Sequence, residues 1–170
     1  GDNDVGGALA SMSGERSWGW NFEVTYSLSE RGLSAEHGTD VYADNWTGIR
    51  RAFLVKENIH RVLDMNSEMK QYIRAEINAL IAYRYMGMFY RYGGVPIVRQ
   101  AYNPDDEIGI PRASLQETLD YVLELCDQAI DSLPHSWDSQ FYGRFTKGAA
   151  MAIKSRVLQF AARPLFNSTN

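Results

Sequence analysis

The sequence predicts an all-α fold built from two helical hairpins, with little or no β-strand. Apolar residues recur at helical spacing over four long segments between residues 41 and about 163. Each segment ends at a helix-stop signal, such as the Gly93-Gly94 pair or Pro134. The composition is 45% hydrophobic and 22% charged over 170 residues, which is typical of a globular chain and not of a disordered one.

Residues 1 to about 40 are expected to form a long irregular segment. They are rich in Gly, Ser, Asn and Asp, and their aromatic residues follow no lasting period. A short helix is expected only near residues 21–28. A connection of this length in a compact domain is either functional or disordered. The sequence begins at Gly1 and not at Met, as expected of a mature or trimmed chain.

The first two helices are predicted over residues 41–65 and 68–92. In the first helix, apolar side chains fall near one face and most basic side chains on the other. Asn66 and Ser67 make the break, and Ser67 is the expected cap of the second helix. The second helix is apolar on most of its circumference, which is typical of a helix buried in a layered array. Its five tyrosines are expected in or beside the core, and Gly93 closes the helix.

The third and fourth helices have clear start signals. Ser114 to Glu117 form a capping box that opens the third helix, and Pro134 ends it. Thr146 is the expected N-cap of the fourth helix, which runs to about Arg163 and is rich in alanine. Helix pairs with small-residue contacts favour a tetratricopeptide-like array, although the strict 34-residue repeat is not visible in the sequence.

The residues predict no catalytic site, no cofactor and no metal. The sequence contains neither an HExxH motif nor a His-Cys cluster, so zinc is unsupported. Cys126 is the only cysteine and falls on the apolar stripe of the third helix, as expected of a core residue. Gly93-Gly94 follows a helix, so it is a C-cap and not a phosphate cradle. A net charge of −4 argues against a nucleic-acid partner.

Two aromatic loops are the better indication of function. Trp18-Gly19-Trp20 places two indoles in a polar segment, and HSWDSQFYGRF carries a second aromatic group before the fourth helix. Indole and phenol rings can stack on the apolar face of a pyranose ring. The alternative is that these rings fold inward and plug the helical array. The candidate ligand-binding residues are Trp18, Trp20, Trp137 and Tyr142.

Four segments in the same order resemble the SusD/RagB family, over about residues 42–167. They are ADNWTGIRRAFLVKENI, AEINALIAYRYMGMFYRYGGVPIV, IPRASLQETLDYVLELCDQAIDSLP and GRFTKGAAMAIKSRVLQFAARPLFN. Family members usually carry an aromatic residue and then an Arg in the middle of the second segment, where this sequence has Ala79 and Ile81. Members are also much longer. The whole chain, 1–170, is therefore expected to be the N-terminal helical domain, without the C-terminal part that supplies much of the ligand surface.

The resemblance implies a SusD-like α–α superhelix and a non-catalytic role. Such proteins are lipid-anchored at the surface of the outer membrane of Bacteroidota-type bacteria. They capture an oligosaccharide or polysaccharide and act as a lid on a SusC-like TonB-dependent transporter, and they need no cofactor. The resemblance also implies a lipidated cysteine upstream of Gly1.

Two alternatives to glycan capture remain open. The helical layout supports equally well a tetratricopeptide-like adaptor whose partner is another protein, with no sugar site in this chain. In addition, related lids take peptides in place of glycans.

Overall fold

The computed structural model describes residues 41–103, 106 and 109–167. Within these residues all regular structure is helical, which confirms the all-α prediction. The four long helices are α3 (Tyr42–Asn58), α4 (Ser67–Tyr92), α5 (Leu115–Ser132) and α6 (Lys147–Ala161). The three short ones are η1 (Ile59–Arg61), η2 (Ser139–Phe141) and α7 (Pro164–Asn167). The predictions for residues 1–40 lie outside the described residues.

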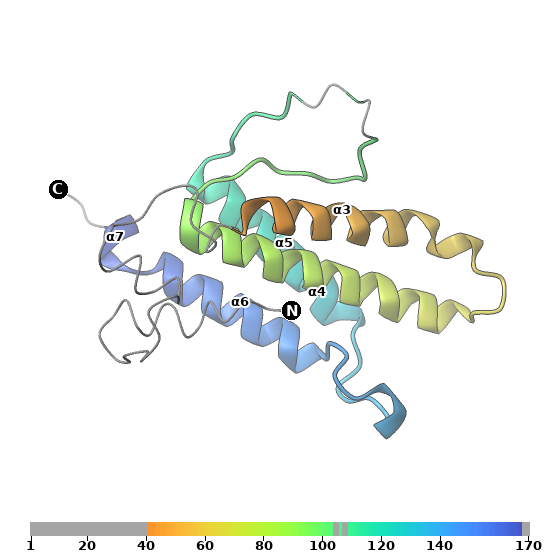
Figure 1. Ribbon diagram of the computed structural model, residues 1–170. Helices are drawn as coiled ribbons and strands as arrows, with labels where there is room; N and C mark the ends of the chain where they lie inside the picture. Colours follow the sequence, from red (N-terminus) through yellow and green to blue (C-terminus); the bar gives the residue numbers. More distant parts are fainter. Residues whose placement is uncertain (1–40, 104–105, 107–108, 168–170) are drawn as a thin grey trace, which may run out of the picture. The chain divides into compact units, whose positions relative to one another are not determined.

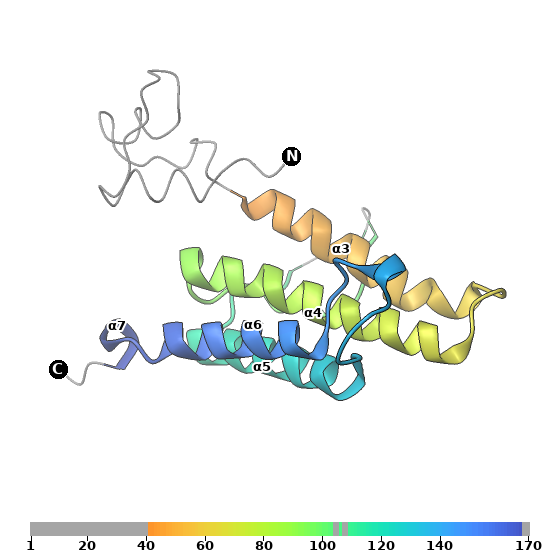
Figure 2. The same ribbon diagram turned by 90° about the horizontal axis from the view of Figure 1, so that it is seen from below.

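Helix α4 is the centre of the described part. Helices α3 and α4 form one hairpin, and α5 and α6 form a second (Figure 1). Seen from below, α4 lies between α3 and α6, with α5 behind α6 (Figure 2). Helix α4 therefore has neighbours on several sides, which explains why it is apolar around most of its circumference.

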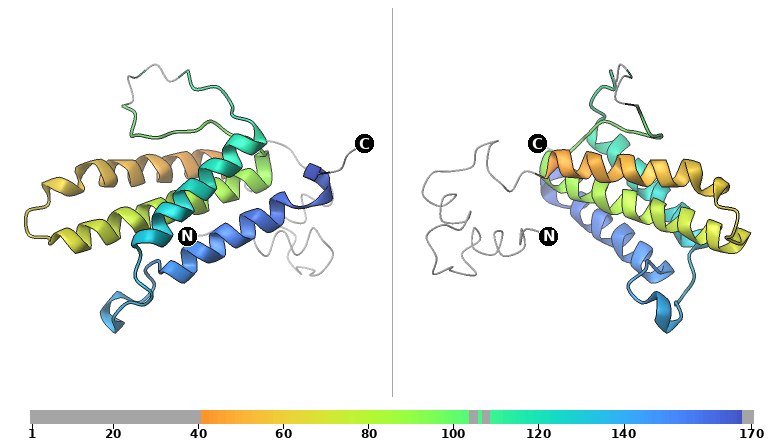
Figure 3. Two further views of the ribbon diagram at one scale, coloured as in Figure 1. Left: turned by 180° about the vertical axis from the view of Figure 1, so that it is seen from behind. Right: turned by 45° about the vertical axis from the view of Figure 1, so that its right-hand side comes forward.

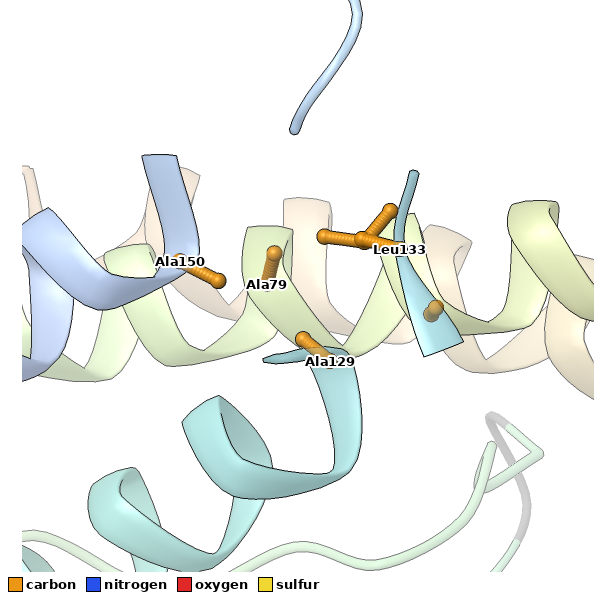
Figure 4. Packing of buried hydrophobic residues seen from close by; sticks show 5 residues of the cluster. Ala79, Ala129, Leu133 and Ala150 are labelled. Atoms are coloured by element: carbon orange, nitrogen blue, oxygen red, sulfur yellow. The ribbon is translucent and has the colours of Figure 1, made fainter. Parts of the chain in front are cut away.

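Small side chains bring the second hairpin close to α4. Ala75 and Ala79 of α4 meet Ala129, Leu133 and Ala150 from the α5–α6 hairpin in one buried cluster (Figure 4). Each of these residues exposes at most 4% of its surface. Alanine side chains let the helix backbones approach closely. Among the alanines of the predicted fourth helix, only Ala150 has this packing role, while Ala152 and Ala162 are exposed.

Helix α3 packs on α4 through larger side chains. Ile49 and Phe53 are almost completely buried. The ring of Trp46 meets that of Tyr85 edge to face, with 5.8 Å between centroids. Lys56 donates to the amide oxygen of the buried Asn78 at 2.7 Å, and burial lowers the pKa of Lys56. Helix α3 and the α5–α6 hairpin are therefore held to α4 by different chemistry.

The helix termini confirm three predicted caps and correct a fourth. The Ser114–Glu117 capping box is present, and Thr146 accepts from the Ala149 amide at 3.2 Å. Gly93 has φ +72°, as the predicted C-cap requires. The cap of α4, however, is Asn66, which accepts from the Met69 amide at 2.7 Å. Ser67, the predicted cap, is already the first residue of the helix.

Two predictions about the first hairpin are wrong. Helix α3 ends at Asn58, before the predicted end at residue 65, because the backbone tightens into the 3₁₀ turn η1. Tyr83 is 52% exposed, although all tyrosines of α4 were expected in or beside the core. None of the described neighbours covers that part of the helix. Tyr85, by contrast, is fully buried; its hydroxyl donates to Pro96 O and accepts from Val98 N.

The connection between α4 and α5 is closed at its base by Arg112. Its guanidinium donates to Gly94 O at 2.7 Å and also to Tyr92 O. A Cβ atom at Gly94 would lie 2.0 Å from Ala113 O, so only glycine permits this approach of the two backbone segments. The first half of the connection, which follows α4, contacts α3. There, Arg50 Nε donates to Tyr102 O at 2.9 Å.

We expect Gly94→Ala to destabilise the fold, because the added methyl group overlaps backbone that cannot move independently. The free energy of unfolding should fall by about 2 kcal/mol or more. The matched control is Gly87→Ala in the middle of α4, where the new methyl group would meet only Arg91 Nη1, at 3.9 Å. That variant should gain up to about 1 kcal/mol from better helix propensity. Urea denaturation measures both, and a similar loss in the two variants would contradict the close approach.

Candidate functional site

The four candidate ligand-binding residues fall into two groups. Trp18 and Trp20 lie outside the described residues. Trp137 and Tyr142 both lie in residues 133–146, between α5 and α6, which we call the aromatic loop. Its central turn projects away from the long helices (Figures 1 and 3). The aromatic loop is therefore the part of the site that can be analysed in atomic detail.

Backbone hydrogen bonds close and shape the aromatic loop. At its base, Lys147 N donates to Pro134 O at 2.9 Å. At its tip, Phe141 N donates to Asp138 O at 2.8 Å within the 3₁₀ turn η2. Gly143 follows with φ +92°, a conformation that glycine adopts without strain. A loop with neighbouring ends and internal contacts is an Ω-type loop, a class that is frequently functional.

An ion pair fastens the aromatic loop to α4. Arg144 Nε lies 3.0 Å from both carboxylate oxygens of Glu76, and a terminal nitrogen of the guanidinium also donates to Glu76. The Phe145 amide donates to Glu76 Oε1 at 3.2 Å. The side chains of Arg144 and Glu76 are only 24% and 15% exposed. One carboxylate therefore satisfies both a guanidinium and a backbone amide of the loop.

Trp137 packs inside the aromatic loop. The guanidinium carbon of Arg144 lies 4.4 Å from the centroid of the Trp137 ring system. Tyr72 of α4 and Phe141 of the loop both approach edge to face, at centroid distances of 5.4 and 5.7 Å. The indole N–H donates to Phe145 O at 2.7 Å. Trp137 therefore contributes to the folded shape of the loop, and part of its surface is already covered.

Tyr142 is placed in the opposite way. It exposes 82% of its surface, and its side chain makes no ring contact or hydrogen bond within the described part of the chain. Phe141, directly before it, packs on Trp137, and Arg144, two residues after it, binds Glu76. The phenol ring of Tyr142 is therefore exposed to solvent, on a segment that is held in place before and after it.

A second polar cluster lies between α5 and the α4–α5 connection, and its role is structural. Arg99 makes a two-pronged contact with Glu124, at 3.1 and 3.0 Å, and holds the pKa of that carboxyl below its usual range. The guanidinium also lies over the Tyr121 ring. Burial raises the pKa of Tyr121 to about 12, and its hydroxyl donates to Val98 O. These contacts tie the α4–α5 connection to α5.

The described residues contain neither a metal-binding cluster nor a reactive thiol. No group of three or more His, Cys, Asp or Glu residues there could hold a metal ion. Burial raises the pKa of the Cys126 thiol to about 11, so this thiol is protonated near neutral pH. An open groove of about 530 Å³ between α5 and α6 is lined by residues such as Ile130, Met151 and Leu158. Its lining contains no aromatic ring, so it does not coincide with the aromatic loop.

Within residues 41–103, 106 and 109–167, no helix combines the length and the apolar character that a membrane span needs.

The sequence pattern predicts the aromatic loop as a candidate site, but it does not predict the ion pair between Glu76 and Arg144 that holds the loop to α4. Glu76 belongs to the second predicted helix and Arg144 to the aromatic loop, but 68 residues separate them and no local spacing indicates that they pair. The only signal was their chemistry: an acid on a largely apolar helix, and a base in an aromatic loop. Such residues need partners when they are buried.

Comparison with known families identifies one family over most of the chain. The SusD-like family described as starch-binding and associating with the outer membrane matches residues 8–158. A comparison with curated protein sequences finds no match.

Several solved structures are similar to this chain. A SusD-like protein from Bacteroides fragilis is 35% identical, with a TM-score of 0.67, over 74% of this chain and 25% of its own. A SusD superfamily protein from Bacteroides thetaiotaomicron is 19% identical, with a TM-score of 0.70, over 89% and 40%. A laminarin-binding SusD-like protein is 23% identical, with a TM-score of 0.64, over 70% and 26%. The chain therefore spans about a quarter to two fifths of the length of these structures.

We expect Glu76→Gln to lower the free energy of unfolding by about 2–4 kcal/mol, because it leaves the Arg144 guanidinium partly buried without its counter-charge. Hydrogen exchange at the Phe145 amide should accelerate as well. The control is Asp131→Asn, an exposed carboxylate on α5 with no recorded partner among the described residues, where the change should stay within about 0.5 kcal/mol. Equal losses in the two variants would rule out a special role for the ion pair.

Proposed function

The chain belongs to the SusD-like family, and on this basis we propose that it acts in the non-catalytic capture of a glycan at the cell surface and its delivery to a SusC-like TonB-dependent transporter. The observation that carries the proposal is the family match over residues 8–158. The family's description as associating with the outer membrane supports the location. A surface lipoprotein anchored through a cysteine upstream of Gly1 is part of the same proposal.

The ligand class follows from the family and from the aromatic loop. The family is described as starch-binding, and one protein of similar fold binds laminarin. A polysaccharide ligand presents pyranose rings with apolar faces, which favour contact with flat aromatic side chains. The exposed ring of Tyr142 supports such a contact. We therefore propose a polysaccharide or oligosaccharide as the ligand.

The residues that carry binding are proposed in three roles. Tyr142 contacts the sugar directly, because its ring is the exposed one. Trp137 shapes the loop, and the uncovered part of its ring adds to the surface that contacts the sugar. Trp18 and Trp20, in residues 1–40, supply two further rings for stacking. The transporter is a separate protein partner, and we do not assign these four residues to the surface that it binds.

The proposal predicts binding that gel mobility can detect. In native gels containing soluble starch or laminarin, the 170-residue chain should migrate more slowly than in gels without polysaccharide. A Trp18→Ala/Trp20→Ala variant should recover part of the lost mobility, because it removes two stacking rings. A protein of similar size that does not bind glycans serves as the mobility reference.

Two outcomes would contradict glycan capture. The first is an unchanged mobility of the folded chain in both polysaccharides, with folding verified by circular dichroism. The second is retention of the chain by a co-expressed SusC-like transporter without any polysaccharide binding, which would favour the protein adaptor. If the chain binds polysaccharide and the transporter does not retain it, only the delivery step of the proposal fails.

A further inference from the structure

We infer that the aromatic loop is a preformed contact surface for an uncharged sugar ring, in which Glu76 and Arg144 are positioning residues that hold Tyr142 outward. This inference rests on the proposed function and adds to it a class of sugar and two residues that do not touch the ligand. Three features of the loop support the inference. Hydrogen bonds hold the loop in shape, its aromatic rings divide into covered and exposed ones, and the charge of its only arginine is balanced by Glu76.

The first feature is order before binding. The base of the loop is closed by the bond from Lys147 N to Pro134 O, and its middle is held to α4 by Glu76. The indole N–H of Trp137 bonds to the backbone of the same loop. A segment fixed at several points loses little conformational freedom when a ligand arrives, so more of the contact energy appears as affinity.

The second feature is the division of the aromatic residues. Trp137, Phe141 and Phe145 are all partly covered, and Trp137 and Phe141 share the Arg144 guanidinium at 4.4 and 5.4 Å. Tyr142 is 82% exposed. A single exposed tyrosine is common on protein surfaces. Here, however, Phe141 directly before it packs on Trp137, and Arg144 two residues after it binds Glu76, so the backbone that carries the ring is held on both sides.

The third feature is charge. Arg144 is the only Lys or Arg within residues 134–146, and its charge is balanced by Glu76 and covered by rings. The exposed polar side chains that remain include His135, Asp138, Ser139 and Gln140. These groups can hydrogen-bond sugar hydroxyls, but none of them is a Lys or Arg that would bind a carboxylate or sulfate group through a charge-assisted hydrogen bond. The loop therefore fits a neutral sugar, and Asp138 disfavours an acidic one.

Arg144 and Glu76 act on the ligand only through the loop. If the ion pair is broken, the loop amides lose protection and Tyr142 samples many orientations. A purely structural role would weaken binding by unfolding the chain. A positioning role makes the effects of Arg144 and Tyr142 depend on each other, because both changes remove the same oriented ring.

The test is native gel electrophoresis in soluble starch and in laminarin, with polygalacturonate as the acidic probe. The variants are Tyr142→Ala, Tyr142→Phe, Arg144→Met, and Arg144→Met combined with Tyr142→Ala. Tyr83→Ala is the matched control, since Tyr83 is also an exposed tyrosine, on α4 outside the loop. Circular dichroism and hydrogen exchange establish that each variant is folded and report the order of the loop.

We expect Tyr142→Ala to weaken binding of the neutral polysaccharides by roughly 3- to 10-fold, the loss of one aromatic stacking contact. Tyr83→Ala should bind as the unmodified chain does, and Tyr142→Phe, which keeps the aromatic ring, should bind more tightly than Tyr142→Ala. Arg144→Met should weaken binding by a similar factor while the chain stays folded, with faster exchange of the loop amides. In the Arg144→Met background, Tyr142→Ala should have little further effect. Polygalacturonate should retard the chain less than either neutral probe.

Any other result contradicts one specific claim of the inference or of the proposed function. If the unmodified chain is retarded and Tyr142→Ala binds equally well, the contact role of Tyr142 is wrong and the proposed function stands. If the effects of Arg144→Met and Tyr142→Ala simply add, the positioning role is wrong. Stronger retardation by polygalacturonate refutes the preference for a neutral sugar. If the unmodified chain is retarded by no probe, glycan capture itself fails, and this inference fails with it.

Discussion

The ion pair between Glu76 and Arg144 is the interaction on which the described part of the structure depends. It joins the middle of α4 to the segment that leads into α6, although 68 residues separate the two side chains. Through the same carboxylate, the Phe145 amide is also satisfied. Because both charges are partly buried, neither is favourable without the other. The pair therefore fixes where the aromatic loop lies and, through it, where α6 begins beside the alanine cluster of α4.

The segments that resemble the SusD/RagB family also carry the contacts that fasten the fold. Arg112 binds the backbone at Gly94, and the Tyr85 hydroxyl bridges Pro96 and Val98. Arg112 joins the end of α4 to the segment before α5, and Tyr85 joins the body of α4 to the connection that follows it. Side-chain hydrogen bonds to backbone of this kind restrict which amino acid can stand at the position, because few side chains have the same length and polar groups. Ligand contacts need only an exposed ring and hydrogen-bonding groups, which many sequences supply. Family membership is therefore easier to recognise than the identity of the ligand.

The two positions that depart from the family pattern have a physical explanation. Ala79 and Ile81 are both fully buried. Ala79 lies in the cluster where α4 meets α5 and α6, so a larger side chain there would push the helices apart. An arginine at position 81 would need a buried partner for its charge. The departures are thus consistent with the apolar packing around α4, and they do not affect the aromatic loop.

What the sequence determined by itself is local. The four helices, the capping box at Ser114, the cap at Thr146 and the left-handed Gly93 all follow from neighbouring residues, and each was predicted. The sequence also located the aromatic loop. Only the tertiary structure decided that Trp137 is packed and Tyr142 is bare, and that Tyr83 faces outward. Those outcomes depend on which distant helix covers a given side chain, and on the pairing of Glu76 with Arg144. Sequence periodicity describes the surface of one helix at a time, so it cannot contain that information.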